Sequence, residues 1–363
     1  NKNMFTLQLE KKTFHQNFHV QKVLFAEDSK LLTMNRRAFE DSTIKKLQIP
    51  QNVKYLDGFS NGAKFLKKIM LSSQNPHFRF ISNNFLVSST NQNCTLFFYN
   101  KHADIAMIPS NINKIGIAAF EYAEICSLTF LRTADGKTNI TELCENCFAS
   151  CNNLQSIEIP ESVQTIDANS FSNCHNLQSV KFSNFELAQI KEIGSYAFYD
   201  CNQLKSIQIP ASVIHLGVGA FAFCKELHSI NFHTTTLEEI SNFTFWECSK
   251  LRSISIPYSV KRIGSRAFDL CADLHKIKFL TNNENSTLLS TIDDNAFNAC
   301  SSLRSLIIPD TVTYIGSFCF SNNFALNTVE IYSTKLTLGS YCFLNCSKLR
   351  LISFPNCSSL SIE

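Results

Sequence analysis

Hydrophobic positions along this chain recur in a unit of roughly two dozen residues. Between Ile193 and Ile209, apolar side chains stand at positions 193, 197, 198, 201, 204, 207 and 209, with polar residues between most of them. The closing phrase Leu-x-x-Ile-x-Ile places alternate residues on one face of a short strand. Because the phrase returns in unit after unit, the pattern predicts parallel strands stacked into one long sheet.

A phenylalanine followed three residues later by a cysteine marks the segment between strands. Successive phenylalanines are 23 to 29 residues apart, a period typical of a solenoid in which each unit packs on its neighbours. This spacing predicts one or two short helical turns facing the core. Phe320 has Asn323 in the cysteine position, which predicts an interruption of the column. The complete pairs are Phe148/Cys151, Phe171/Cys174, Phe198/Cys201, Phe221/Cys224, Phe245/Cys248, Phe268/Cys271, Phe297/Cys300 and Phe343/Cys346.

The repeat divides the chain into three segments. Irregular units occupy residues 1–75, and regular units occupy residues 109–363. In residues 76–108, apolar runs alternate with Asn- and Ser-rich turns, which predicts an inserted antiparallel β-hairpin module. We therefore expect a curved leucine-rich repeat solenoid, with a parallel β-sheet on its concave face and short helical turns and loops on its convex face.

Composition narrows the classes of function. The 363 residues are 44% hydrophobic and 17% charged, as in folded proteins. A net charge of +3 is too small to favour nucleic acid or an anionic membrane as partner. No apolar run approaches the ~20 residues that span a bilayer. The polar start, from Asn1 to Gln16, indicates that a signal segment is absent or removed. The end in mid-pattern, with Leu360 and Ile362, indicates either a fragment of a longer protein or a last strand that forms the edge of the sheet.

The 15 cysteines are mostly periodic, which favours a ladder of buried thiols over the alternative of a disulfide framework. Cys144-x-x-Cys147-x-x-x-Cys151 has the spacing of a zinc or iron–sulfur site. However, Cys147 and Cys151 belong to periodic columns and no histidine is near. We therefore predict no metal and no cofactor. The nine histidines form no visible pairing with an off-pattern cysteine, so we predict no catalytic residue and no enzyme.

The repeat resembles a known family. Residues 256–274 read Ile-Pro-x-Ser-Val-x-x-Ile-Gly-x-x-Ala-Phe-x-x-Cys-x-x-Leu, which is similar to the BspA-like type of leucine-rich repeat. The resemblance covers residues 110–360 and, less closely, 30–71. It implies a surface protein of the adhesion type that binds host matrix or other cells, and it implies no catalytic residue. The Asn- and Phe-rich composition favours a protist source.

Two columns of outward residues are the candidate binding positions. One column lies between the two apolar residues of each strand, and the other follows each leucine of the repeat. The second column carries four Lys or Arg and two His, a mild basic stripe. An ordinary solvated sheet face is the alternative. The expected partner-binding residues are Lys181, Lys205, Gln208, His228, Asn231, Arg252, His275, Lys278, Arg304, Glu330 and Arg350.

These observations predict non-catalytic protein–protein recognition through the sheet face, as in adhesion or ligand binding at a cell surface or outside the cell. The protein ligand would be host matrix, another cell surface or an assembly neighbour, with no nucleic acid and no membrane span in this chain. An intracellular scaffold, such as a cytoskeletal one, is the alternative, and an enzyme a distant third. Glycosylation sequons in predicted loops at Asn139 and Asn285 are candidate modification sites.

Overall fold

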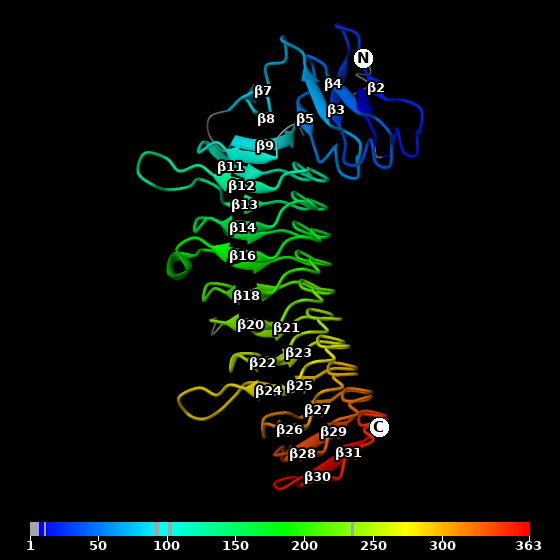
Figure 1. Ribbon diagram of the computed structural model, residues 1–363, viewed down its shortest axis with the longest axis vertical. Helices are drawn as coiled ribbons and strands as arrows, with labels where there is room; N and C mark the ends of the chain where they lie inside the picture. Colours follow the sequence, from blue (N-terminus) through cyan, green and yellow to red (C-terminus); the bar gives the residue numbers. More distant parts are fainter. Residues whose placement is uncertain (1–6, 11, 91–93, 101–103, 234–235) are drawn as a thin grey trace, which may run out of the picture. The chain divides into compact units, whose positions relative to one another are not determined.

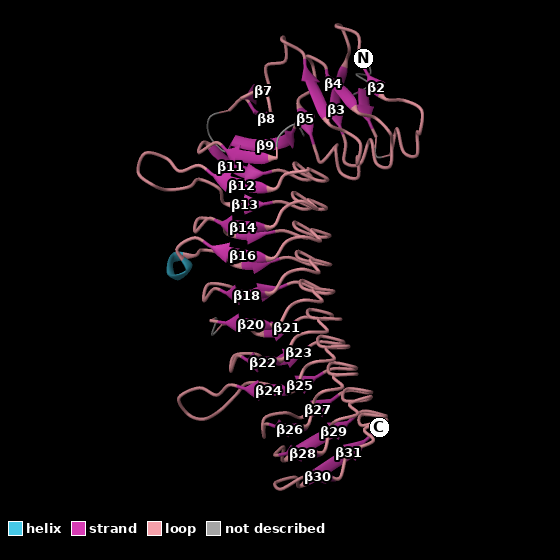
Figure 2. Ribbon diagram, viewed as in Figure 1, coloured by secondary structure: helices cyan, strands magenta, loops and turns pink. Residues whose placement is uncertain are grey.

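The computed structural model describes residues 7–10, 12–90, 94–100, 104–233 and 236–363. They form a β-solenoid of stacked parallel strands, as the repeat predicts (Figure 1). Two compact units make up the chain. Unit 1 is Asn1–Leu154 with Asn169–Cys174, and unit 2 is Gln155–Ala168 with His175–Glu363. Figure 2 shows strands joined by loops, and the one helix of the described residues is the 3-10 turn η1 (Phe185–Leu187).

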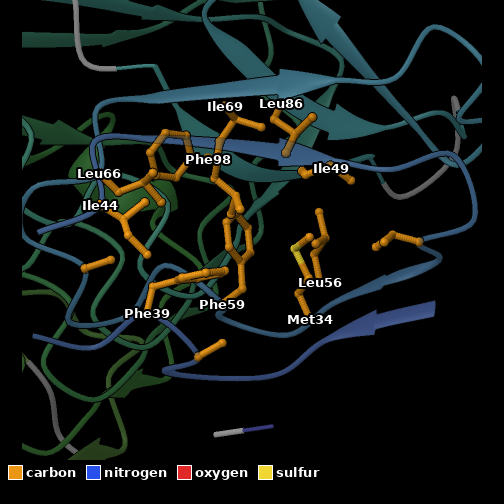
Figure 3. Close-up of a cluster of buried hydrophobic side chains, with 14 of the residues drawn as sticks. Met34, Phe39, Ile44, Ile49, Leu56, Phe59, Leu66, Ile69, Leu86 and Phe98 are labelled. Carbon is orange, nitrogen blue, oxygen red and sulfur yellow. The ribbon is translucent and has the colours of Figure 1, made fainter. Parts of the chain in front are cut away.

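Unit 1 begins with two parallel three-stranded ladders around a hydrophobic core. Phe39 and Phe59 in the turns pack there with Leu86 and Phe98 of the following module (Figure 3). Burying such side chains contributes about 1.5–3 kcal/mol each before the loss of entropy. The strands are β1 (Leu7–Leu9), β3 (Leu31–Met34) and β5 (Tyr55–Leu56) in one ladder, and β2 (Lys22–Val23), β4 (Lys46–Ile49) and β6 (Lys68–Leu71) in the other.

The predicted antiparallel module is present. Strands β7 (Phe78–Ile81), β8 (Phe85–Ser88) and β9 (Cys94–Tyr99) pair antiparallel in sequence order. Positive φ angles at Ser82 and Asn83 give the β7–β8 turn the twist that hairpins favour. Residues 91–93 and 101–103 of the predicted segment lie outside the described residues.

Asn75 fixes the start of this module. Its Oδ1 accepts hydrogen bonds from the backbone N–H groups of His77 at 2.8 Å and Phe78 at 3.2 Å. Its Nδ2 donates to the carbonyl oxygens of Pro50 at 2.8 Å and Val53 at 3.0 Å. The buried side chain therefore ties the first hairpin strand to the segment that follows β4.

The solenoid resumes after the module, still within unit 1. Strand β9 pairs in parallel with β11, and the Tyr99 ring stacks on Phe120 with centroids 4.8 Å apart. The module thus ends by supplying one rung of the regular stack. The further strands of unit 1 are β10 (Ile105–Ile108), which pairs with β12 (Ser127–Phe130), and β11 (Ile112–Ile115), which pairs with β13 (Glu142–Leu143).

Each repeat of unit 2 supplies two strands. The first, long strand has three or four residues, and the second has two, except in the last two repeats, where it has four. Strands of one kind pair in parallel from repeat to repeat, although the long strands fall into three separate sheets. The long strands are β14 (Ser156–Ile159), β16 (Ser179–Phe182), β18 (Ser206–Ile209), β20 (Ser229–Phe232), β22 (Ser253–Ile256), β24 (Lys276–Phe279), β26 (Ser305–Ile308), β28 (Thr328–Ile331) and β30 (Leu351–Ser353). The second set is β15 (Thr165–Ile166), β17 (Glu192–Ile193), β19 (His215–Leu216), β21 (Glu239–Ile240), β23 (Arg262–Ile263), β25 (Thr291–Ile292), β27 (Tyr314–Ile315), β29 (Lys335–Leu338) and β31 (Ser359–Ile362).

The repeated phenylalanines form a continuous stack in the core of unit 2. The rings of Phe198 and Phe221 are nearly parallel, with centroids 5.4 Å apart. The same stacking continues to Phe343 at centroid separations of 5.0–5.8 Å. These separations lie in the range where aromatic pairs attract each other. The phenylalanine of each unit therefore contacts its equivalents above and below.

The cysteines of the repeat act as hydrogen-bond donors. The thiol of Cys224 donates to the carbonyl oxygen of Phe198, one unit earlier, at 3.2 Å. Six further thiols donate in the same way to the phenylalanine carbonyl oxygen of the preceding repeat, at 3.1–3.3 Å. The predicted interruption at Asn323 is wrong in this respect, because its Nδ2 donates to the carbonyl oxygen of Phe297 at 3.0 Å.

The segments around the phenylalanines are single turns and not helices. In the repeat of Phe198, the N–H of Cys201 donates to the Phe198 carbonyl oxygen at 3.2 Å, and the N–H of Leu204 then donates to the Cys201 carbonyl oxygen at 2.9 Å. Tyr196 and Asp200, two residues before and after the phenylalanine, have φ angles of +57° and +54°. Left-handed residues at these two places recur in the other units and stop helix growth. The predicted helical turns therefore take the form of a series of three-residue turns that do not build a helix.

Candidate binding face

The predicted binding residues lie within the long strands of unit 2 or one position before them. Alternation accounts for those within the strands, as in β18, where Ser206 and Gln208 are exposed, whereas Ile207 and Ile209 are buried. Strands β14, β22 and β26 have the same alternation. Alternate side chains of a strand point to opposite faces, and the apolar set fills the core. The polar set is therefore presented to solvent.

The outward column within the strands is chemically mixed. The register places Gln208 beside Asn231, and Ile307 beside Glu330. Ile307 is 60% exposed, so the column also offers an apolar contact. Its predicted members are Lys181, Gln208, Asn231 and Lys278, which are exposed, and Glu330, which is half-buried.

The column that precedes the strands is tied together through the backbone. The N–H of His228 donates to the carbonyl oxygen of Lys205 at 2.9 Å, and the N–H of Arg252 donates to that of His228 at 3.2 Å. The N–H of His275 continues the series to Arg252 at 3.0 Å. The side chains of Lys205, His228, Arg252 and His275 therefore extend from consecutive repeats, whose strands are about 4.8 Å apart.

A second run of the same column follows the loop after β24. The N–H of Asn327 donates to the carbonyl oxygen of Arg304 at 2.8 Å, and the N–H of Arg350 donates to that of Asn327 at 2.9 Å. Of the predicted residues in both runs, only His228 is half-buried. We call this set the basic row: Lys205, His228, Arg252, His275, Arg304 and Arg350.

The strong cations of the basic row lack acidic partners. In the part of the chain that the structure describes, no ion pair involves the Lys or Arg residues of the row. Nearby, Lys250 Nζ lies 2.7 Å from Glu226 Oε1. That hydrogen bond lowers the pKa of Glu226, and the charge of Lys205 contributes to the same effect. The positive charge of the row is thus left for solvent or a ligand.

Three members of the basic row share a pocket. The pocket has a volume of about 560 Å³ and is open to solvent. Arg252 and His275 come from adjacent rungs, and Arg304 comes from the rung after the loop. The full lining is Arg252, Asp273, His275, Ser301, Ser302, Arg304 and Ala325.

The column pattern of the sequence did not identify three of the polar lining residues. Asp273, Ser301 and Ser302 stand in the turns between the repeat cysteine and the repeat leucine. The Ser301 hydroxyl donates to the carbonyl oxygen of Ala272 at 3.3 Å. Their position in the repeat could have identified them in the sequence, because Asp273 stands two residues before His275 and Ser302 stands two residues before Arg304.

The candidate metal spacing takes on structural roles. Cys151 donates its thiol to the Phe120 carbonyl oxygen at 3.2 Å, as a member of the thiol ladder. The Cys144 sulfur lies 3.7 Å from Oε1 of Glu142. Cys144, Cys147 and Cys151 are all buried, and none of the three forms a disulfide.

The two candidate glycosylation sites are exposed. Asn139 in unit 1 donates from Nδ2 to the Ser110 carbonyl oxygen at 2.8 Å. Asn285 in unit 2 has a φ angle of +58°, in the turn that begins at Asn282. Both side chains reach solvent, which is the geometric requirement for attachment of a glycan.

Comparison with protein families gives one clear match. The model of the BspA type leucine-rich repeat region, which describes six copies of the repeat, matches four overlapping stretches of the chain: residues 5–97, 91–192, 183–287 and 279–362. No curated protein sequence matches the chain.

The described residues contain no helix with the length and apolar character that a membrane span requires.

Solved structures share the fold. A leucine-rich repeat protein from Bacteroides ovatus is 24% identical, with a TM-score of 0.61 over 78% of this chain and 76% of its own. One from Eubacterium ventriosum is 21% identical, with a TM-score of 0.60 over 77% of this chain and 84% of its own. A leucine rich cell surface protein from Faecalibacterium prausnitzii is 22% identical over 94% of this chain and 89% of its own, with a TM-score of 0.49.

Proposed function

Because the chain belongs to the BspA type leucine-rich repeat family, we propose that it is a non-catalytic recognition protein that binds another protein through the sheet face of unit 2. The observation that carries the proposal is the basic row, whose Lys and Arg side chains are exposed without acidic partners among the described residues. A mixed column lies beside it, with polar, charged and apolar side chains. A protein surface can match such a mixture.

The surface placement of this function rests on the family resemblance. In this proposal the partner is a protein of the extracellular matrix or of another cell surface, and the chain is an adhesion or ligand-binding protein. No step of the proposed function requires a cofactor, a nucleic acid or a membrane span in this chain.

The test replaces the four strong cations of the row. The face variant is Lys205→Glu, Arg252→Glu, Arg304→Glu and Arg350→Glu. The control variant makes the same change of charge outside the sheet face, at Lys191, Lys261, Arg266 and Lys335. These residues lie in or near strands of the second set. Each protein is cross-linked to preparations of surface and matrix proteins, and circular dichroism confirms the fold. The proposal requires partners that the face variant loses and the control variant keeps. Identical capture by both variants would overturn it.

An intracellular scaffold is the second candidate, and the observation that favours it is that none of the 15 cysteines, all of which lie in the described residues, forms a disulfide. Intact-mass measurement of the native protein separates the two candidates. Hexose attached at Asn139 or Asn285 supports secretion, whereas 15 free thiols without sugar support the cell interior.

A further inference from the structure

We propose that the pocket of Arg252, His275 and Arg304 binds the side-chain carboxylates of an extended acidic peptide segment in a partner protein. This inference rests on the proposed function and names the ligand class for one part of the same face.

The first support is convergence of positive charge. Arg252 and Arg304 line one pocket of about 560 Å³ together with His275. A guanidinium group presents paired N–H donors that match the two oxygens of a carboxylate. Two such groups on one wall can hold two carboxylates of the same segment.

The second support is the contrast with the other basic side chains of unit 2. Several other exposed cations of unit 2 have an internal acidic partner: Lys261 lies 2.7 Å from Glu238, and Arg262 lies 2.5 Å from Glu239. The two pocket arginines have no such partner in the described residues, although Asp273 lines the same pocket. Their donors therefore remain available to carboxylates from outside.

The third support concerns the choice of a peptide over a polyanion. Asp273 and the hydroxyls of Ser301 and Ser302 also line the pocket. A phosphodiester backbone has no donor for the Asp273 carboxylate and would be repelled by it, whereas peptide N–H groups can donate to it. Exposed Ile307 in the adjoining column and Ala325 in the lining add apolar contact. The net charge of +3 is likewise small for a polyanion-binding protein.

The spacing of the arginines suggests the form of the peptide. Arg252 and Arg304 stand two rungs apart, with His275 between them, which corresponds to about 10 Å at the usual strand spacing. In a polyproline II segment, residues i and i+3 lie on one side and about 9 Å apart, at ~3.1 Å per residue. Acidic residues at every third position therefore suit the two arginines.

The probe is a fluorescein-labelled peptide of four Glu-Ala-Pro repeats, with four Gln-Ala-Pro repeats as its uncharged match. Fluorescence anisotropy at ~0.15 M salt measures binding to the whole chain. We expect the glutamate peptide to bind at least about tenfold tighter than the glutamine peptide. We expect Arg252→Gln with Arg304→Gln to abolish the difference, and Lys261→Gln with Arg266→Gln to leave it unchanged.

Three results would overturn the inference: equal binding of the two peptides, binding unaffected by the pocket variant, or a clear preference for heparin or single-stranded DNA that competes at the same arginines. The cross-linking test of the sheet face is separate. If the peptide fails while the face variant still loses its partners, only the ligand class is wrong. If the peptide binds while capture of partners is unchanged, the proposed function fails and the pocket assignment stands.

Discussion

The side-chain amide of Asn323 donates to the carbonyl oxygen of Phe297 at 3.0 Å, in the place where other units use a thiol. A second bond from the same Nδ2 reaches the Phe320 carbonyl oxygen at 2.8 Å. The feature that the repeats share in this column is thus a buried donor, which satisfies the carbonyl group of the phenylalanine in the preceding repeat. In the described residues, Oδ1 of Asn323 has no hydrogen-bond partner.

Asn323 provides a direct test of the donor column. Asn323→Cys keeps a donor and removes the buried acceptor without a partner, so we expect a free energy of unfolding at least equal to that of the natural chain. Asn323→Ala leaves the Phe297 carbonyl group without this donor and should cost about 2 kcal/mol. Urea titration measures both changes, with exposed Asn327→Ala as the control. Equal stability of the alanine and cysteine variants would contradict the donor role.

Leu270 tests the left-handed positions of the turns. It is 40% exposed and has a φ angle of +63°, a conformation that costs most residues about 1–2 kcal/mol but suits asparagine better. Asn322 and Asn345 occupy the same place in later units, with φ angles of +59° and +60°. We expect Leu270→Asn to raise the free energy of unfolding by about 1 kcal/mol. Leu288→Asn, at an exposed leucine without positive φ, should change it by less than about 0.5 kcal/mol.

Asn75 tests the attachment of the hairpin module in unit 1. Asn75→Ala removes four hydrogen bonds from a buried site, and we expect a loss of about 2–4 kcal/mol. Exposed Gln74 next to it is the control, since Gln74→Ala should have little effect. Thermal unfolding and hydrogen exchange of residues 78–88 measure the outcome. Unchanged protection of these residues would show that the module does not depend on Asn75.

The accessible thiols can be separated from the buried ones by alkylation. Cys126 is exposed, whereas Cys224, Cys248 and Cys271 are buried. Burial raises the pKa of those three thiols well above the ordinary 9.0, so almost no thiolate is present at pH 8. In the native chain we expect iodoacetamide to label Cys126 rapidly and the three buried cysteines only after unfolding. Peptide mass mapping measures the rate at which each cysteine is labelled. Equal rates for Cys126 and the three buried cysteines would contradict the burial of the thiol ladder.

The same thiols predict a loss of stability in alkali. Burial raises the folded-state pKa of Cys342 to about 12, from an ordinary 9.0. Stability from a raised pKa is fully present below pH 9 and declines as the pH rises toward 12, because only the unfolded chain readily releases the proton. Each such thiol lowers the free energy of unfolding by about 1.4 kcal/mol per pH unit in this window. Urea titrations from pH 8 to pH 11 should show this slope, and Cys342→Ala should reduce it. An equal slope in that variant would contradict the assignment.

Several features could be predicted because they depend on local periodicity. The Phe198 stack follows from the period between repeats, and the alternation of Ile207 and Gln208 follows from spacing within one strand. The hairpin module, predicted at residues 76–108, follows from apolar runs separated by Asn- and Ser-rich turns. The order of the basic row also follows, because residues at equivalent positions of a solenoid must lie in line. For the same reason, the sequence alone predicts Lys205 and Arg252 on the sheet face.

The sequence by itself determined the repeat, its core residues and its outward columns, since the period decides which side chains face inward. The tertiary structure decided which groups of different units meet. It showed that Cys224 donates to the carbonyl oxygen of Phe198, that Asn323 preserves this bond, and that Asp273 and Ser302 join the arginines in one pocket. These relations join atoms more than 20 residues apart, and their geometry depends on left-handed turns and loop lengths that a hydrophobic pattern does not encode.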